Sequence, residues 1–403
     1  MPRSRLVAAV VLALVIAFGA GVLYFDRDSS DDGSVTAAPG AADTTEQPDA
    51  PKTAPPVTAP PPTTTTTTPH DPARSFNLTK VTTIGGRISP KSVISTGTGL
   101  VFAQNMMYQH SVTVYDADGT LVKTIDDSVD LAKFGYPGFP GISKGAPVEA
   151  AVDHAGKSVF ASNYAMYGNG HGPEGSDECG GPGGLTPSFV YEIGLKSLAI
   201  DKVGQVGMVP KYVVVTPNDK YVLVTNWCSY DMSVLDRATL KEVKRVPLGA
   251  YPRGIVVNAS SSIAYVAVMG STQVARVDLG SFAVNTFTVG SSPRHLVLSP
   301  DGRRLYVTLN GESSVVAVDT ATNQVVGRVN TGSQPRSMTI SPNGQALYVV
   351  NYSAGTMSVV RTSDLGIAQT IQVPSHPIGI AYEPVKHRVW VACYSGEILV
   401  YDA

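Results

Sequence analysis

Cysteine and charge are both scarce in this chain. Its 403 residues include three cysteines, and charged residues make up 15% of the sequence. Three cysteines cannot build a disulfide scaffold and do not suggest a zinc module. Thirty Lys and Arg against 32 Asp and Glu give a net charge of −2, which argues against a protein that coats nucleic acid through bulk charge. The 39 glycines and the low charge favour β-sheets joined by turns over helical bundles.

Several motifs that carry chemistry are also absent. The sequence has no Walker loop, no His-Glu-x-x-His string and no Cys-x-x-Cys-His string. These motifs mark phosphate cradles, zinc peptidases and haem attachment sites. We therefore expect no cofactor and no metal, and a non-enzymatic protein rather than an enzyme.

One long apolar run stands at the N-terminus. Leu6 to Phe25 carries no charge, and about 20 apolar residues span a bilayer as a helix. Arg3 and Arg5 precede the run and four aspartates follow it, so the positive-inside rule predicts residues 1–5 in the cytoplasm and the body outside. The alternative is a cleaved signal peptide and a secreted protein. No cysteine occurs before Cys179, which excludes a lipidated N-terminus.

Residues 26–75 have low complexity. They are rich in proline and threonine and include the unbroken run Thr63 to Thr68. Such chains extend as polyproline II and build no core. The segment is predicted to be a disordered stalk, with O-glycosylation possible on its threonines. A passive solvated spacer explains it equally well.

The rest of the chain, residues 76–403, repeats one unit with a period of about 42 residues. Each unit opens with a proline, followed by an apolar strand, a turn and further short strands. The opening prolines are Pro90, Pro147, Pro210, Pro252, Pro293, Pro335 and Pro377. Short β-branched strands joined by Gly, Asn and Asp turns at this period predict the four-stranded blades of an all-β, seven-bladed propeller.

Two features complete the predicted ring. Insertions near Leu131 to Gly145 and Ala165 to Pro187 lengthen the first two intervals between prolines. The last unit stops at Ala403 after three strands, and its missing strand is available at Leu78 to Ile84. Closing the ring with this N-terminal strand removes exposed sheet edges.

The repeat resembles a known family. Tyr221-Val222-Leu223-Val224-Thr225-Asn226 and its counterparts in other units are similar to the YVTN-repeat, or YncE-like, β-propellers, and the resemblance covers Phe76 to Ala403. It implies an exported or surface propeller, and one bacterial relative is associated with DNA binding. Related seven-bladed propellers include lactonases and the streptogramin lyase. No complete catalytic set of either enzyme matches residues of this chain.

A ring of cations is predicted at one mouth of the central channel. The residue after each opening proline begins the innermost strand. Five of these seven positions are basic: Lys91, Lys211, Arg253, Arg294 and Arg336, with Val148 and Ile378 at the other two. Clustered cations attract anions, and arginine also offers a planar fork to carboxylate or phosphate. The alternative is that each cation is a structural clamp on the neighbouring blade.

Three further residues are candidate acid or base groups. Glu149 and His295 lie one position beyond the ring, and His376 immediately precedes Pro377. They are candidates for catalysis. The alternative places them as satisfied polar residues on the channel wall.

Aromatic residues gather in the loops between second and third strands, on the face where both insertions fall. They are Tyr108, Tyr164, Tyr167, Trp227, Tyr230, Tyr352 and Tyr394, and the first insertion adds Tyr136 and Phe139. With Asn105, Asn163, Asn226 and Asn351 nearby, they are candidates for a platform that binds sugars, peptides or bases. Packing between blades is the alternative for any single ring. We single out Tyr164, Trp227 and Tyr352 as ligand-binding candidates.

Cys179 lies in the second insertion and Cys228 in the equivalent loop of the next unit. Because these loops are neighbours and the predicted compartment is oxidising, we predict a disulfide that holds the insertion as a lid. Cys393 is predicted to be a free core thiol. The acidic string of the insertion, with His171, Glu174, Asp177 and Glu178, lacks the spacing of known calcium loops.

These features predict a monomeric, membrane-tethered propeller outside the cell membrane. Its expected role is non-enzymatic binding or scaffolding at the envelope, through the basic and aromatic face, of an envelope polymer or a protein. Two alternatives stay open. One is a lactonase-like or lyase-like enzyme that uses Glu149, His295 and His376, and the other is single-stranded DNA binding.

Overall fold

The computed structural model describes residues 75–403 except 108, 173–177, 181–183 and 375. The described residues belong to one compact unit. The tail at 1–5, the apolar segment at 6–25 and all of the stalk at 26–75 except Ser75 lie outside the described residues. Across the part that is described, no helix is long and apolar enough to cross a bilayer.

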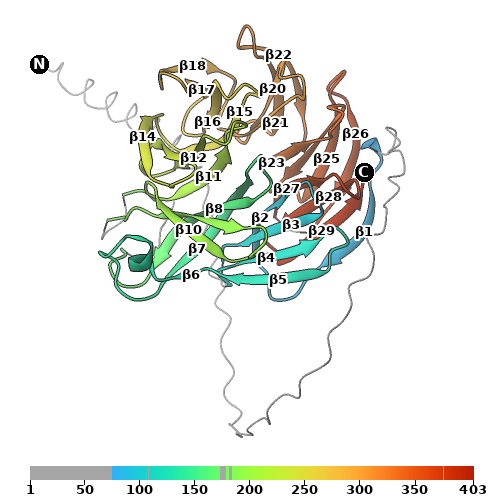
Figure 1. Cartoon of the computed structure of the whole chain (residues 1–403). Helices are drawn as coiled ribbons and strands as arrows, with labels where there is room; N and C mark the ends of the chain where they lie inside the picture. The colour runs from blue at the N-terminus through green and yellow to red at the C-terminus, as the bar shows by residue number, and fades with distance from the viewer. Residues whose placement is uncertain (1–74, 108, 173–177, 181–183, 375) are drawn as a thin grey trace, which may run out of the picture. The chain divides into compact units, whose positions relative to one another are not determined.

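The described residues form seven antiparallel sheets that follow one another in chain order (Figure 1). Blade 1 contains β2 (Pro90–Ser95), β3 (Leu100–Asn105), β4 (Ser111–Asp116) and β5 (Leu121–Asp126). Blade 2 contains β7 (Ser143–Val152), β8 (Ser158–Tyr167), β9 (Phe189–Gly194) and β10 (Ile200–Gln205), with the short β6 (Ser128–Val129) beside β7. Blade 3 contains β11 (Pro210–Val215), β12 (Tyr221–Asn226), β13 (Asp231–Asp236) and β14 (Glu242–Pro247).

The remaining blades repeat this order. Blade 4 contains β15 (Pro252–Val257), β16 (Ile263–Val268), β17 (Gln273–Asp278) and β18 (Val284–Thr288). Blade 5 contains β19 (Pro293–Leu298), β20 (Arg304–Leu309), β21 (Ser314–Asp319) and β22 (Gln324–Asn330). Blade 6 contains β23 (Pro335–Ile340), β24 (Ala346–Asn351), β25 (Thr356–Arg361) and β26 (Ile367–Gln372). Blade 7 contains β27 (Pro377–Glu383), β28 (Arg388–Cys393), β29 (Glu397–Asp402) and β1 (Thr79–Ile84). The predicted seven-bladed all-β propeller is confirmed.

Burial explains why the second and third strands are so apolar. Tyr221–Asn226 and Asp231–Asp236 of blade 3 are buried along most of their length, whereas Glu242–Pro247 at the outer edge is mostly exposed. The inner strands are covered on both faces by neighbouring blades, so they read as continuous apolar runs instead of alternating. One apolar cluster, for example, joins Tyr265 of blade 4 to Val307 of blade 5.

The ring closes as the sequence predicts. β1 pairs with β29 in antiparallel register from Thr79 opposite Asp402 to Ile84 opposite Ile398 (Figure 1). The residues before β1 are also attached, because the Tyr348 hydroxyl donates to the Ser75 carbonyl at 3.1 Å. Leu78 is buried in the apolar cluster between blades 6 and 7. The N-terminal strand therefore supplies both sheet hydrogen bonds and core packing.

This closure makes a prediction about truncation. A chain of residues 85–403 should be less stable to urea than a chain of residues 75–403, by about 3 kcal/mol or more. Loss of Leu78 and of the β1 ladder exposes the edge of β29 and opens the core. Equal unfolding midpoints and slopes for the two chains would show that β1 does not stabilise the ring.

Candidate binding site in the central channel

A left-handed residue precedes the opening proline in five of the seven blades. The φ angles lie between 53° and 62° and belong to residues other than glycine. The residues are Val209, Tyr251, Ser292, Gln334 and His376. This conformation is costly for residues with a Cβ, so the surrounding structure must hold it.

Hydrogen bonds from the next loop hold these residues. In each of the five blades, the backbone N–H that follows the second strand donates to the carbonyl of the left-handed residue. The pairs are Trp227 to Val209 at 2.9 Å, Met269 to Tyr251 at 3.0 Å, Asn310 to Ser292 at 2.9 Å, Tyr352 to Gln334 at 2.9 Å and Tyr394 to His376 at 3.0 Å. We call this side, which carries the loops between second and third strands, the loop face. The opposite side is the turn face.

A β-bulge follows immediately. In all seven blades the pairing of the first two strands shifts register directly after the opening proline, as between Pro210 and Tyr212. Bulges re-aim side chains that would otherwise alternate. As a result, consecutive residues such as Arg294 and His295 both line one small cavity on the axis.

The five predicted ring cations are buried. Their exposed fractions run from 1% to 5%, and they belong to Lys91, Lys211, Arg253, Arg294 and Arg336. Val148 and Ile378 complete the ring and are buried as well. The ring is therefore an internal layer of positive charge near the loop face, and it is not an open basic patch.

Aromatic rings cover this layer. Lys211 Nζ lies 4.4 Å from the ring centroid of Tyr164 and 5.2 Å from that of Trp227. The guanidinium carbon of Arg336 lies 4.0 Å from the Tyr352 centroid. Such cation–π contacts stabilise charge where water is excluded. Tyr164 and Trp227 are both buried and contact Lys211. These contacts favour the packing role that the sequence analysis gave as the alternative to ligand binding.

The remaining rings are more accessible. Tyr352 and Tyr394 are half-buried, and His376 beside them is exposed, with its ring centroid 4.6 Å from that of Tyr352. Across the channel, Tyr230 is exposed and its ring meets that of the half-buried Tyr251 edge to face at 5.6 Å. We call these five residues the aromatic collar. Tyr108 lies outside the described residues.

The predicted asparagines do not belong to a surface platform. All four are buried. Asn226 accepts a hydrogen bond from the Gly207 N–H at 3.1 Å and donates to Asp231 at 2.7 Å, and Asn351 donates to Thr356 and Ser358 at 3.0 Å each. Asn105 and Asn163 bond within their own blades in the same manner. They fix the end of the second strand, where the loop begins.

A polar layer lies directly below the cations. Its members occupy the second position after the proline in five blades: Ser92, Glu149, Tyr212, His295 and Ser337. The Tyr212 hydroxyl lies 2.8 Å from His295 Nε2. The structure thus brings Glu149 and His295 to one layer, whereas His376 stays exposed on the loop face.

Charge and burial act in opposite directions on Glu149. Burial raises its pKa from 4.5 to about 7, although the charges of Lys91, Arg253 and Arg294 and an interaction with the Ser92 side chain lower it. Burial lowers the pKa of His295 to about 3, and Arg294 and Arg253 lower it further. His295 is therefore neutral at pH 7, and Glu149 is divided between its acid and its anion.

The channel continues from this layer to the turn face as a cavity of about 480 Å³. Its lining reaches His154 and Pro217, which lie in turns between first and second strands. At the loop face, Val148, Tyr164 and Trp227 belong to one apolar cluster. The cavity is accessible from the turn face, which its lining reaches.

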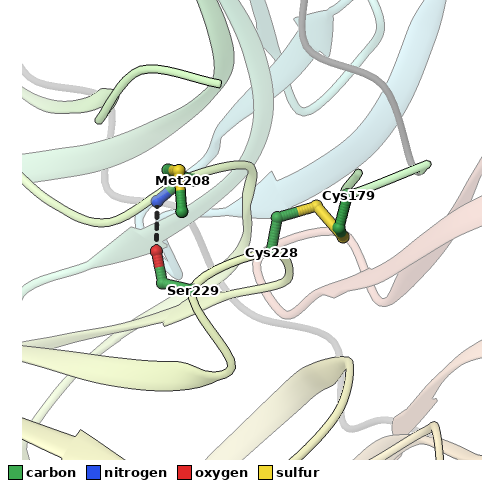
Figure 2. Close-up of a disulfide and its surroundings, with 4 residues drawn as sticks. All are labelled: Cys179, Met208, Cys228 and Ser229. Atoms are coloured by element: carbon green, nitrogen blue, oxygen red, sulfur yellow. Dashed lines mark hydrogen bonds between the residues drawn. A yellow bond between two sulfur atoms is a disulfide. The ribbon is translucent and has the colours of Figure 1, made fainter. Parts of the chain in front are cut away.

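The predicted disulfide is present. Cys179 and Cys228 are bonded, with their Cα atoms 5.1 Å apart (Figure 2). The loop that carries Cys228 is itself fixed, because the Met208 N–H donates to the Ser229 hydroxyl at 2.7 Å (Figure 2). Cys393 is free and buried, as predicted. The bond ties the insertion of blade 2 to blade 3 over the apolar cluster.

The two insertions pack against each other. Phe139 of the first stacks on His171 of the second at 4.6 Å, and Tyr136 meets Phe189 edge to face at 5.0 Å. The first insertion includes the 3-10 helix η2 (Leu131–Phe134). Glu174 and Asp177 lie outside the described residues, and no group of three metal-binding side chains occurs among the residues that are described.

Sequence analysis missed two kinds of residue. Tyr212 and Ser337 share the polar layer with Glu149 and His295, and reading the second position after the proline in every unit would have found them. A Gly-x-Ser-x-Gly string around Ser143 was also overlooked. Ser143 Oγ lies 3.0 Å from His171 Nε2, but Ser143 is buried at the start of a strand. The nucleophile elbow needs a strand-to-helix turn with an exposed serine.

Comparison with known proteins shows the fold. No family model and no curated protein matches the chain. Among solved structures, the chain is similar to a Kuenenia stuttgartiensis hydrazine synthase structure with a TM-score of 0.62. The two are 16% identical, and the match covers 79% of this chain and 97% of that one. Identity this low carries the fold and no function. The chain is a seven-bladed β-propeller, and its membership of the YVTN-repeat family stays a prediction.

The disulfide predicts a thiol pattern and a stability change. Without reductant, the native protein should take up no alkylating agent at pH 8, because Cys393 is buried and its pKa is raised to about 12 by burial. The unfolded chain should take up one equivalent. Replacing Cys179 and Cys228 by Ser should lower the free energy of unfolding by about 2–4 kcal/mol. Cys393→Ala, which leaves the disulfide intact, is the control, and three reactive thiols in the unfolded chain would contradict the bond.

The raised pKa of Glu149 predicts that the free energy of unfolding depends on pH. Its pKa is raised from 4.5 to about 7 in the folded chain, so the unfolded chain ionises first and stability falls as pH rises from about 4.5 to 7. Glu149→Gln removes this loss. The variant should melt a few degrees above the wild type at pH 8, and this advantage should vanish at pH 4. Glu242→Gln on the exposed outer strand is the control, and an advantage of Glu149→Gln that is constant with pH would contradict the shift.

Proposed function

We propose that this chain is a non-enzymatic, extracytoplasmic binding module that contacts an anionic polymer of the cell envelope through its loop face. The observation that carries the proposal is the aromatic collar over the buried cation layer. Rings that are half-buried or exposed are stacked on this face, with Tyr352 resting on Arg336. Stacked rings bind the faces of sugars, and the positive layer beneath them attracts anions.

The location belongs to the same proposal. The disulfide favours an oxidising compartment, and the uncharged run Leu6 to Phe25 favours a membrane tether. The proline-rich segment between the run and the propeller is suited to act as a spacer that holds the propeller away from the membrane. We also propose that the chain is a member of the YVTN-repeat family, because its strand motif recurs from blade to blade. Membership of that family would fit an exported propeller.

No specific observation favours either alternative, the lactonase-like or lyase-like enzyme or the single-stranded DNA-binding protein. The enzyme hypothesis placed Glu149, His295 and His376 together, but His376 is exposed on the loop face while the other two lie inside the channel. Single-stranded DNA would meet the same aromatic collar and the same buried cations as an envelope polymer. Single-stranded DNA therefore serves as a competing ligand in the test.

The collar predicts a loss of polymer binding in a triple variant. Tyr230→Ala, Tyr352→Ala and His376→Ala together should weaken cosedimentation with isolated, deproteinated cell walls by roughly tenfold or more, because truncation of an aromatic residue that anchors an interface costs about 1 kcal/mol or more. The same assay with single-stranded DNA across a salt series measures the alternative, which requires affinity that falls steeply with salt.

Tyr221→Ala is the matched control. Tyr221 is also half-buried and lies beside a cation, since Lys220 Nζ is 4.8 Å from its ring centroid, but it stands at the turn face. The control should bind walls like the wild type. Equal wall binding by the folded triple variant and the wild type would exclude the collar as the contact surface. Tighter binding to single-stranded DNA than to cell walls would show that nucleic acid, and not an envelope polymer, is the ligand.

A further inference from the structure

We infer that the central channel is a second, separate binding site, which takes a small carboxylate with an apolar tail from the turn face. The inference concerns the opposite end of the channel from the aromatic collar and does not rest on polymer binding. It stands on the two-layered lining of the cavity, on the hydrogen-bonding groups of the polar layer and on the charges behind that layer.

The lining has the two layers that an amphiphile requires. The polar layer forms the floor of the cavity. The next inward position, two residues further along, lines the cavity in six of the seven first strands and is apolar in five of them: Ile94, Val214, Val256, Val297, Thr339 and Ala381. Two residues of a strand advance about 7 Å. A ligand that reaches the floor with a polar head therefore passes its tail through the apolar layer toward the turn face.

The volume suits a small molecule. The cavity measures about 480 Å³, within the range of about 300–1,000 Å³ that is usual for ligand pockets. In blades 4 and 7 the second position after the proline is glycine, which lets the first strand approach that of the next blade closely. A Cβ at Gly254 would lie 2.8 Å from the Arg294 carbonyl oxygen, and one at Gly379 would lie 2.7 Å from the Ser92 Cα. The narrow floor limits the head to a small group.

The floor supplies hydrogen-bond donors. Tyr212, Glu149 and Ser337 are half-buried and line the cavity. His295 is neutral, and its Nδ1 has no hydrogen-bond partner among the described residues. When Nε2 carries the proton it donates to the Tyr212 oxygen, which leaves the Tyr212 hydroxyl hydrogen for a ligand acceptor. Protonated Glu149 is a second donor to an acceptor at the same place.

The charges around the floor select the sign of the ligand. Glu149 is faced by cations from neighbouring first strands, and the Arg336 guanidinium lines the same small cavity. The charged and titratable groups around it are Lys91, Arg253, Arg294, Arg336, Tyr212 and His295. Lys91, Arg253 and Arg294 act on Glu149 electrostatically. A ligand anion is stabilised by the same cations, whereas an amine is repelled by them.

Binding of an anion beside Glu149 requires that carboxyl to be protonated, because two adjacent carboxylates repel each other. The pKa of Glu149 is raised to about 7 by burial. An aliphatic carboxylate is itself ionised throughout the range from pH 6 to 9. Affinity should therefore be level near pH 6 and fall by up to tenfold for each pH unit above about 7.

The test is isothermal titration of the full chain, held in a nonionic detergent, with acetate, butyrate and hexanoate and with hexylamine and hexanol. Affinity should rise by roughly fourfold for each CH₂ from acetate to hexanoate, and hexanoate should bind more tightly than the amine or the alcohol. Tyr212→Phe should weaken hexanoate by roughly 10- to 100-fold. Glu149→Gln keeps a donor and should abolish the pH dependence between pH 6 and 9.

Tyr265→Phe is the matched control, because Tyr265 is a tyrosine buried between blades and away from the channel. It should bind hexanoate like the wild type. Melting curves establish that each variant is folded. The inference is wrong if hexylamine or hexanol binds as tightly as hexanoate, or if hexanoate does not bind at millimolar concentration. It is also wrong if folded Tyr212→Phe binds unchanged, or if Glu149→Gln keeps the pH dependence of the wild type.

Discussion

The bend before five of the seven opening prolines is the constraint on which much of the centre of the molecule depends. A left-handed residue turns the chain toward the axis, and one backbone hydrogen bond from the next loop holds it there. Each such residue costs about 1–3 kcal/mol in an isolated chain, so the bend persists only because the finished blade imposes it. In five blades, the bulge that follows the proline sends two consecutive side chains of the first strand to the axis. A regular strand would send one, and the cation layer and the polar layer would not be neighbours.

That proximity gives the two ends of the channel different characters. Near the loop face, cations are enclosed by aromatic rings and by an apolar cluster that the disulfide holds in place. Toward the turn face, the wall is aliphatic and accessible. Glu149 lies between these regions. Three cations favour its ionised form, but burial opposes them more strongly, and its pKa ends near 7. The loss of water around this carboxyl therefore outweighs the attraction of its neighbours.

The sequence was sufficient for the fold because its information is periodic. The opening prolines set the blade boundaries, the three-strand ending at Ala403 required the strand at Leu78 to Ile84, and equivalent loops predicted the pairing of Cys179 with Cys228. The burial of the cations was not predictable in the same way. Lys211 and Arg253 follow a left-handed residue, Val209 in one blade and Tyr251 in the other, whereas Lys91 is buried without one. No glycine marks the bend, because tertiary contacts and not local preference produce it.

The pairing of β1 with β29 also sets an order of events during synthesis. Thr79 is made long before its partner Asp402. Until β29 is available, six blades can pair internally while β1 has no strand to join. Contacts between residues so distant in sequence form slowly. We therefore expect β1 to join β29 after the other six blades have paired, and a chain interrupted before β29 to keep a sheet edge open to other chains.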